Sequence, residues 1–252
     1  MSSAQERLII DLDGESPQVA EEMVRFFSPY VHAFLLGQEF QAALLCRFVM
    51  SNYETEQEHT MDLWRTRSLL GAIGSQLFLD TRWSASPLTI EHAAKRLQAI
   101  HPKYLTVQAN AGRRAIETAV NHKGTSKILG IAVLDLQDAD CFDIYDNSPL
   151  KQVFVLTTIA KNAHADGIVC ETSDLRNLHR LGGFDEVMKV ARGIVPSWAR
   201  KNQRGLSPKE AISYGADMLI IGRKDLAMPV SWTAHDCFSA IIEEIESVPV
   251  PA

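Results

Sequence analysis

The sequence predicts one (β/α)8 barrel, a TIM barrel of the α/β class, that spans residues 1–252 as a single domain. Eight short, continuously apolar runs recur along the chain, and longer amphipathic stretches separate them. Runs that are apolar without alternation are typical of parallel strands buried on both faces. Eight strand–helix units in 252 residues match the barrel in number and in length. A doubly wound open sheet is the alternative, but its usual GxGxxG turn after the first strand is missing from the sequence.

The strands are expected at the eight apolar runs: residues 8–10, 33–36, 77–79, 104–107, 128–134, 167–170, 193–195 and 218–221. Amphipathic helices are expected at five stretches between or after them: residues 17–27, 89–100, 150–163, 209–214 and 234–246. Ser148-Pro149 and Ser207-Pro208 have the pattern of an N-cap followed by the first helical residue. Glu210, three residues after Ser207, completes a predicted capping box.

The connection between the second and third expected strands, residues 38–76, is longer than the others. It holds two amphipathic pieces, residues 41–49 and 61–73, on either side of a polar run. We therefore expect an extra helical insertion in the barrel instead of a second domain. The tail at residues 247–252 carries two prolines, which cannot continue a helix, and we expect it to be loose.

The composition argues against several classes of protein and partner. Hydrophobic residues make up 46% of the chain and charged residues 22%, as in ordinary globular domains. The net charge is −6 and no basic stripe occurs, so no nucleic-acid partner is expected. A membrane partner is not expected either, because no apolar run approaches about 20 residues. The N-terminus lacks a signal-peptide pattern and the four cysteines form no CxxC pair, so we expect a cytoplasmic protein without metal or other cofactor.

The active site of such a barrel is built at the C-terminal ends of its strands. Reading these positions from the sequence gives a polar rim with several carboxylates and two arginines. The rim positions are Asp11, Asp13, Gly37, Asp80, Arg82, Gln108, Asn110, Asp135, Glu171, Pro196, Ser197, Gly222 and Arg223. Any one of them is as readily a solvated loop residue as a site residue.

The end of the last expected strand predicts a phosphate site. Gly222 allows backbone N–H groups to approach a phosphate, and Arg223 offers a bidentate guanidinium. The loop at residues 196–205 adds cationic side chains and hydrogen-bond donors after the seventh expected strand. Phosphate sites in these barrels are often built from the loops after strands seven and eight. We favour this interpretation over a solvated basic loop.

The same region resembles a known family. Residues 203–212, then Gly215-Ala216-Asp217 and Ile221-Gly222-Arg223, are similar to the C-terminal motifs of the orotidine 5′-phosphate decarboxylases. Residues 11–13, 77–80 and 166–170 resemble other strand motifs of that family, in the same order. The resemblance implies a (β/α)8 homodimer that removes CO2 from a nucleotide without cofactor or metal.

The resemblance also implies roles for individual residues. Gln203 and Arg223 match the phosphate ligands of the family, and Asp13 matches an acceptor of a ribose hydroxyl group. With their neighbours, the expected phosphate-binding residues are Gln203, Gly222, Arg223 and Ser197. The expected substrate-binding residues are Asp11, Gln108, Asn110, Asp135 and Thr89, of which Thr89 matches a position near the dimer partner.

The catalytic motif of the family, DxKxxD, is altered in this chain. It reads Asp80-Thr81-Arg82-Trp83-Ser84-Ala85, so the first Asp is kept, the Lys is Arg82 and the second Asp is Ala85. A further lysine of the family falls at Leu35. Because a guanidinium group stays protonated at physiological pH, arginine is a poor proton donor but binds anions well.

We therefore expect a diverged decarboxylase-like lyase that binds a phosphorylated small molecule, a nucleotide or a sugar phosphate. Its candidate catalytic residues are Asp80, Arg82 and Asp13, although Asp80 is equally suited to a structural pairing with Arg82. A genuine orotidine 5′-phosphate decarboxylase and a non-catalytic phosphate-binding pseudoenzyme are the alternatives. A homodimer is expected through residues 83–89, where apolar side chains would be costly to leave in water.

Overall fold

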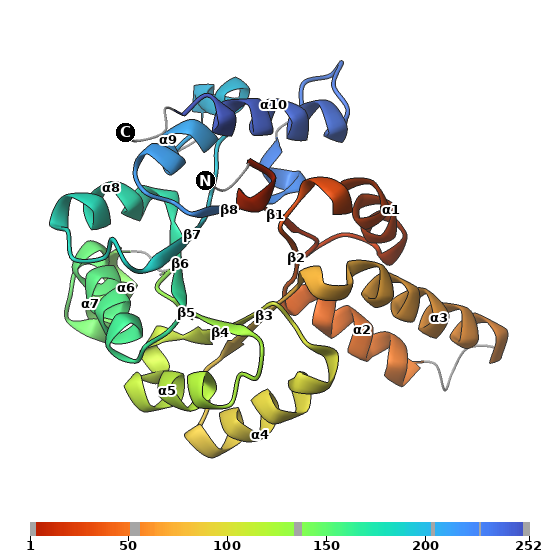
Figure 1. The fold of residues 1–252 in the computed structure, drawn as a ribbon, viewed down its shortest axis with the longest axis horizontal. Coiled ribbons are helices and arrows are strands. Elements are labelled where there is room, and N and C mark those ends of the chain that lie inside the picture. The colour runs from red at the N-terminus through yellow and green to blue at the C-terminus, as the bar shows by residue number, and fades with distance from the viewer. Residues whose placement is uncertain (1–3, 51–55, 134–137, 203–204, 227, 249–252) are drawn as a thin grey trace.

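The computed structural model describes residues 4–50, 56–133, 138–202, 205–226 and 228–248. It contains a closed barrel of eight parallel strands in sequential order, surrounded by helices (Figure 1). The strands are β1 (Leu8–Asp11), β2 (Ala33–Leu36), β3 (Leu77–Trp83), β4 (Tyr104–Gln108), β5 (Lys127–Ile131), β6 (Gly167–Glu171), β7 (Met188–Arg192) and β8 (Met218–Gly222). The predicted (β/α)8 fold is thus confirmed.

The helices lie around the outside of the barrel, in the connections between the strands and after β8 (Figure 1). They are α1 (Pro17–Phe27), α2 (Gln38–Met50), α3 (Glu56–Ile73), α4 (Pro87–Leu97), α5 (Arg113–Asn121), α6 (Asp138–Tyr145), α7 (Pro149–Asn162), α8 (Thr172–Leu181), α9 (Pro208–Ser213) and α10 (Ala234–Glu246). The bounds of α1 and α10 equal the predicted ranges. Ser207 and Glu210 form the predicted capping box, whereas the side chain of Ser148 stands at the N-cap of α7 without a capping hydrogen bond.

Buried apolar side chains form two layers. One cluster fills the barrel interior and includes Leu35, Phe78 and Tyr104, while a larger cluster lies between the strands and the helices. Leu35, at the position where the resemblance implies a lysine, is 5% exposed among these interior side chains. At this position the chain therefore packs an apolar group under the mouth of the barrel.

The seventh strand was predicted at the wrong place. The apolar run at residues 193–195 follows the strand, which is Met188–Arg192, and Ile194 makes only an isolated bridge to Leu206. The prediction failed because Lys189 interrupts the apolar pattern of the true strand. Lys189 is buried, and its ammonium group donates to two backbone carbonyl groups of the preceding loop at 2.7 and 3.1 Å. Such bonds offset the cost of removing a charge from water.

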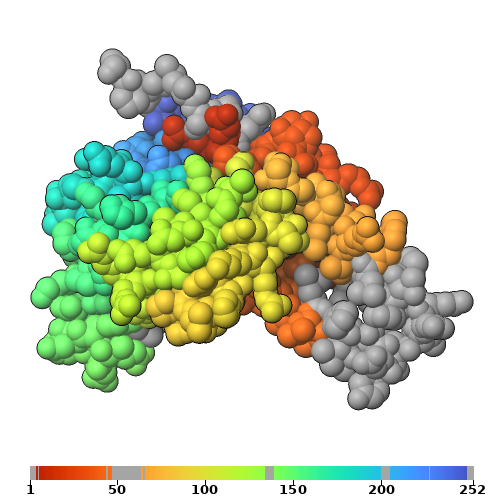
Figure 2. All heavy atoms as spheres, turned by 60° about the horizontal axis from the view of Figure 1, so that its bottom comes forward, coloured from red at the N-terminus to blue at the C-terminus, as the bar shows by residue number. Residues whose placement is uncertain are grey.

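The connection between β2 and β3 carries α2 and α3, which contact each other, and α3 also packs against α1. This pair extends away from the barrel (Figure 1). On another part of the outer surface α4 and α5 lie side by side (Figure 2). Within the described ranges, every helix is too short or too polar to span a bilayer. Of the predicted loose tail at 247–252, residues 249–252 lie outside the described residues.

Candidate functional site

A cavity of about 240 Å³ lies inside the barrel at the C-terminal ends of the strands. Apolar side chains of the barrel interior, among them Leu35, Phe78 and Ile220, contribute to its lining. Charged side chains from four strand ends and the segment after β8 complete it: Asp11, Asp13, Asp80, Arg82, Glu171, Arg192, Lys224 and Asp225. The structure thus brings together all three candidate catalytic residues at one cavity.

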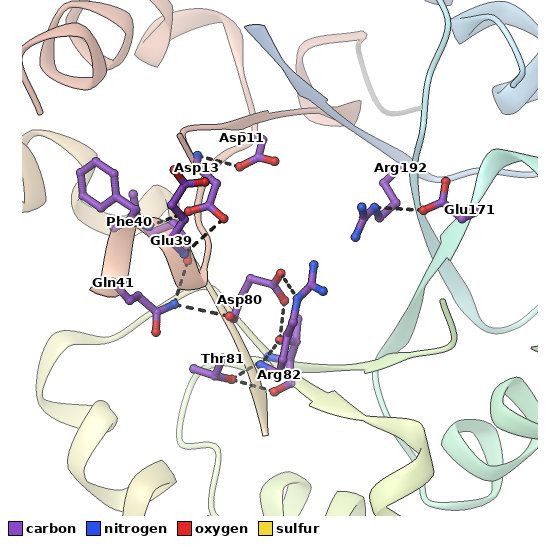
Figure 3. Close-up of polar contacts among 12 residues, drawn as sticks. Asp11, Asp13, Glu39, Phe40, Gln41, Asp80, Thr81, Arg82, Glu171 and Arg192 are labelled. Atoms are coloured by element: carbon purple, nitrogen blue, oxygen red, sulfur yellow. Dashed lines mark hydrogen bonds and ion pairs between the residues drawn. The ribbon is translucent and has the colours of Figure 1, made fainter. Parts of the chain in front are cut away.

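Asp80 and Arg82 form an ion pair on β3. The strand runs on to Trp83 through a register shift, and Arg82 adopts a φ of 45°, which is uncommon for a residue with a side chain. Arg82 Nε donates to Asp80 Oδ2 at 2.7 Å (Figure 3). Thr106 on β4 joins them, because its Oγ1 donates to Asp80 Oδ1 at 2.7 Å and accepts from the Arg82 backbone N–H at 2.8 Å. The Asp80 residue is only 6% exposed, so the pair is held in a fixed geometry.

Asp13 lines the cavity and also caps a helix. Its Oδ1 accepts the backbone N–H of Phe40 at 2.7 Å, and its Oδ2 lies 3.4 Å from the backbone nitrogen of Glu39. Both bonds come from the first turn of α2, where unpaired N–H groups favour a negative charge. Gly37 makes room for this contact, because a Cβ at that position would overlap the Asp13 carboxylate.

Asp11 is a buried carboxyl group next to this helix cap. Its Oδ1 accepts the backbone N–H of Asp13 at 2.9 Å. Burial raises the pKa of Asp11 to about 6, the Asp13 backbone N–H opposes this rise in the pKa, and the charge of Asp13 adds to it. A carboxyl group with such a pKa in a cavity is a candidate for proton transfer near neutral pH.

Glu171 and Arg192 form a second ion pair, at the ends of β6 and β7. Arg192 Nε lies 3.0 Å from Glu171 Oε1, and both residues line the cavity (Figure 3). Glu171 was among the predicted rim positions. Arg192 was missed, because the misplaced seventh strand moved the expected strand end to Pro196. A charged residue followed by Gly193 after two apolar residues was the signal that marked the true strand end.

The predicted phosphate residues are partly engaged with other groups. The Gly222 backbone N–H donates to Asp225 Oδ2 at 2.8 Å, and Arg223 Nη1 lies 3.5 Å from Glu15 Oε2 with its side chain 46% exposed. The backbone N–H of Ser197 donates to a carboxylate of α10, outside the cavity. Gln203 lies outside the described residues.

The remaining predicted substrate residues do not line the cavity among the described parts of the chain. Asn110 Nδ2 donates to the hydroxyl group of Tyr145 at 3.1 Å, and Thr89 takes part in the N-cap of α4. Gln108 ends β4 and is partly buried. Asp135 lies outside the described residues. Within the described ranges, no group of three or more His, Cys, Asp or Glu side chains is placed to hold a metal ion.

Comparisons with known proteins point to one family, although no family model matches the chain. The orotidine 5′-phosphate decarboxylase of Sphingopyxis alaskensis is 32% identical over 161 residues, which cover 61% of this chain and 70% of that enzyme. The enzyme of the same name from Gluconobacter oxydans is 29% identical over 97% of this chain and 99% of its own. The crystal structure of orotidine 5′-phosphate decarboxylase from Lactobacillus acidophilus has a TM-score of 0.68 at 22% identity, covering 96% of this chain and 99% of that one. This last likeness concerns the fold.

Proposed function

The chain belongs to the orotidine 5′-phosphate decarboxylase family, and from this premise we propose that it is a diverged decarboxylase-like lyase for a phosphorylated small molecule. The observation that carries the proposal is the Asp80–Arg82 pair, which Thr106 holds at the cavity. Such a fixed pair of opposite charges, half enclosed by protein, is suited to stabilising charge that develops in a reaction. The pair keeps the first carboxylate of the family motif while exchanging its proton donor.

The proposed reaction breaks the bond between a substrate carbon and its carboxylate. The electron pair of that bond stays on the carbon, CO2 leaves, and the carbon then takes up a proton. Arg82 is a poor source of this proton, because a guanidinium group stays protonated at physiological pH. Asp11 is the better source, since its pKa of about 6 leaves part of the group protonated near neutral pH.

The size and charges of the cavity favour a sugar phosphate that also carries the carboxylate to be removed, over a nucleotide. Its volume of about 240 Å³ is below the range of about 300–1,000 Å³ that is usual for pockets of drug-sized ligands. Carboxylates are hydrogen-bond acceptors, so Asp11, Asp13 and Asp225 suit a ligand with several hydroxyl groups. Arg82 and Arg192 supply positive charge for its anionic part.

A genuine orotidine 5′-phosphate decarboxylase is the second candidate, and Lys224 is the observation that favours it. The described residues that line the cavity include one lysine, Lys224. An ammonium group can be tuned toward a proton donor, which a guanidinium group cannot easily be. In that reaction Lys224 would deliver the proton in place of the lost family lysine.

An activity assay with a ligand screen separates these functions. We expect purified protein to turn over orotidine 5′-phosphate with a kcat below about 1 s⁻¹, whereas a sugar phosphate that carries a carboxylate stabilises it in a thermal-shift panel. A kcat above that value would favour the genuine decarboxylase, and Lys224→Met would then abolish it. Conversion of the best ligand should be lost in Asp80→Asn and kept in Asp185→Asn, an exposed control with the same charge change. If Asp80→Asn changes only the affinity for that ligand, the protein is a binder and the lyase proposal fails.

A further inference from the structure

We propose that Arg192, positioned by Glu171, binds the anionic group of the ligand at the ends of β6 and β7, an inference that rests on the function proposed above. The group it takes is an oxyanion, either a phosphate or a carboxylate. The phosphate residues expected from the sequence are Gly222 and Arg223 at the end of β8, with Ser197 and Gln203 in the loop after the seventh strand. Arg192 was not among them.

The first support is the geometry of the ion pair. Glu171 and Arg192 are register partners on neighbouring parallel strands. Arg192 Nε is 3.0 Å from Glu171 Oε1, and the two side chains are 33% and 26% exposed, so the pair is neither on the open surface nor sealed in the core. Figure 3 shows the Arg192 guanidinium group directed into the cavity, toward the side that carries Arg82. A planar guanidinium group has five N–H donors, so it can pair with a carboxylate and bind another oxyanion as well.

The second support is the backbone around the pair. Gly193 has a φ of 74°, and a Cβ there would overlap the carboxylate of Glu171. Thr172 Oγ1 donates to the carbonyl oxygen of Gly193 at 2.7 Å, which ties the segment after β7 to the start of α8. The backbone thus leaves space for the Glu171 carboxylate, and the guanidinium group beside it is held from both strand ends. Such positioning is expected of a ligand contact, whereas a mobile surface pair has no need of it.

The third support is the state of the predicted phosphate residues. The Gly222 N–H already donates to the carboxylate of Asp225 at 2.8 Å, so this donor is engaged within the protein. Arg223 lies 3.5 Å from Glu15 with its side chain nearly half exposed, and it does not line the cavity. Arg192 is therefore better placed than Arg223 to meet an anion inside the barrel.

The test compares three five-carbon probes that carry different charged groups. Ribose 5-phosphate carries a phosphate, ribonate carries a carboxylate, and ribose carries neither. Dissociation constants are measured by calorimetry for the wild type, Arg192→Met, Arg192→Lys and Arg223→Met. Arg25→Met is the matched control, because Arg25 on α1 does not line the cavity, is paired with Glu21, and carries the same charge.

We expect Arg192→Met to weaken the binding of at least one of the two anions by about tenfold or more, as loss of a charge-assisted hydrogen bond does. The probe whose affinity falls shows whether Arg192 binds a phosphate or a carboxylate. Arg192→Lys should recover part of the affinity, since it keeps the charge and loses the fork, and it also serves if the Met variant does not fold. Arg25→Met should bind like the wild type.

Two results would overturn the assignment, and they are distinguishable. If both Arg192 variants bind the anions like the wild type while Arg223→Met loses them, the anion sits at the end of β8. Arg192 is then not a ligand contact, but the proposal that the protein binds a phosphorylated ligand is unaffected. If the wild type binds neither anion more tightly than ribose, the present inference and the proposed function both fail.

Discussion

Neighbouring groups give the carboxylates of the cavity different properties, although the residue type is the same. Asp80 accepts from Arg82 and Thr106, and Asp13 accepts from the first turn of α2. Asp11 accepts a backbone N–H from its own segment, and burial raises its pKa to about 6. The same side chain therefore serves as part of an ion pair, as a helix cap and as a group that titrates near neutral pH.

Asp11→Asn should stabilise the protein at neutral pH and less so in acid. Because the folded-state pKa of about 6 lies above the ordinary 3.8, the folded state prefers the protonated form. The favourable contribution of Asp11 is full below about pH 3.8 and is lost as the pH rises through 6. By then ionisation has cost at most about 3 kcal/mol of unfolding free energy. Asparagine stays neutral and keeps an oxygen for the Asp13 backbone N–H.

Urea unfolding from pH 4 to pH 8 measures this effect. The advantage of Asp11→Asn over the wild type should grow up to about pH 6.5 and then level off. Asp185→Asn, which removes a surface carboxylate, should show no such growth. A constant difference between Asp11→Asn and the wild type at every pH would contradict the prediction.

Among the elements, α2 depends on a contact from another strand end. Its first turn is capped by Asp13, which follows β1, and Gly37 leaves the space for that carboxylate. The extra helices between β2 and β3 are thereby joined to the wall of the cavity. The start of α2 and the position of Asp13 are consequently coupled.

Gly37→Ala and Gly71→Ala should therefore have opposite effects. An alanine at 37 displaces the Asp13 carboxylate and removes the cap, at a cost of about 1–2 kcal/mol. For a chain of this size that lowers the Tm by roughly 2–8 °C. Gly71 lies in α3 with nothing within 4 Å of an added Cβ, so alanine there should raise stability by up to about 1 kcal/mol. Thermal unfolding of both variants checks this, and a Gly37→Ala variant as stable as the wild type would refute the coupling.

At the scale of the whole molecule, the segment after β3 is the expected site of contact between two chains. We propose a homodimer through residues 83–89, as the family resemblance implies. Leu88 at the start of α4 is 61% exposed, so a second chain packed on this segment would bury it. This segment continues directly from Arg82, which lines the cavity at the end of β3. A partner chain bound there would therefore lie close to the site.

Leu88→Glu should weaken the dimer by about tenfold or more, because a charge would enter an apolar contact. Sedimentation velocity at micromolar concentration measures the change. Leu181→Glu is the matched control, since Leu181 is 54% exposed on α8 and lies outside the proposed interface. A wild type that sediments as a monomer under these conditions would refute the homodimer.

The sequence by itself determined the barrel, its strand order and the bounds of α1 and α10. These features follow from apolar runs, helical periodicity and caps, all of which act between residues a few positions apart. It also indicated that Asp11, Asp13, Asp80 and Arg82 lie at strand ends and share one rim. These predictions needed no knowledge of which side chains touch.

Only the tertiary structure decided the pairings that define the site. The position of β7, and with it the Glu171–Arg192 pair, depends on the register between neighbouring strands. The use of Asp13 as a cap for α2 joins residues 27 positions apart. The physical reason is that hydrogen bonds and ion pairs between such segments depend on strand register and backbone direction, which the closed barrel sets as a whole. The sequence pattern of a single segment specifies neither the strand register nor the backbone direction.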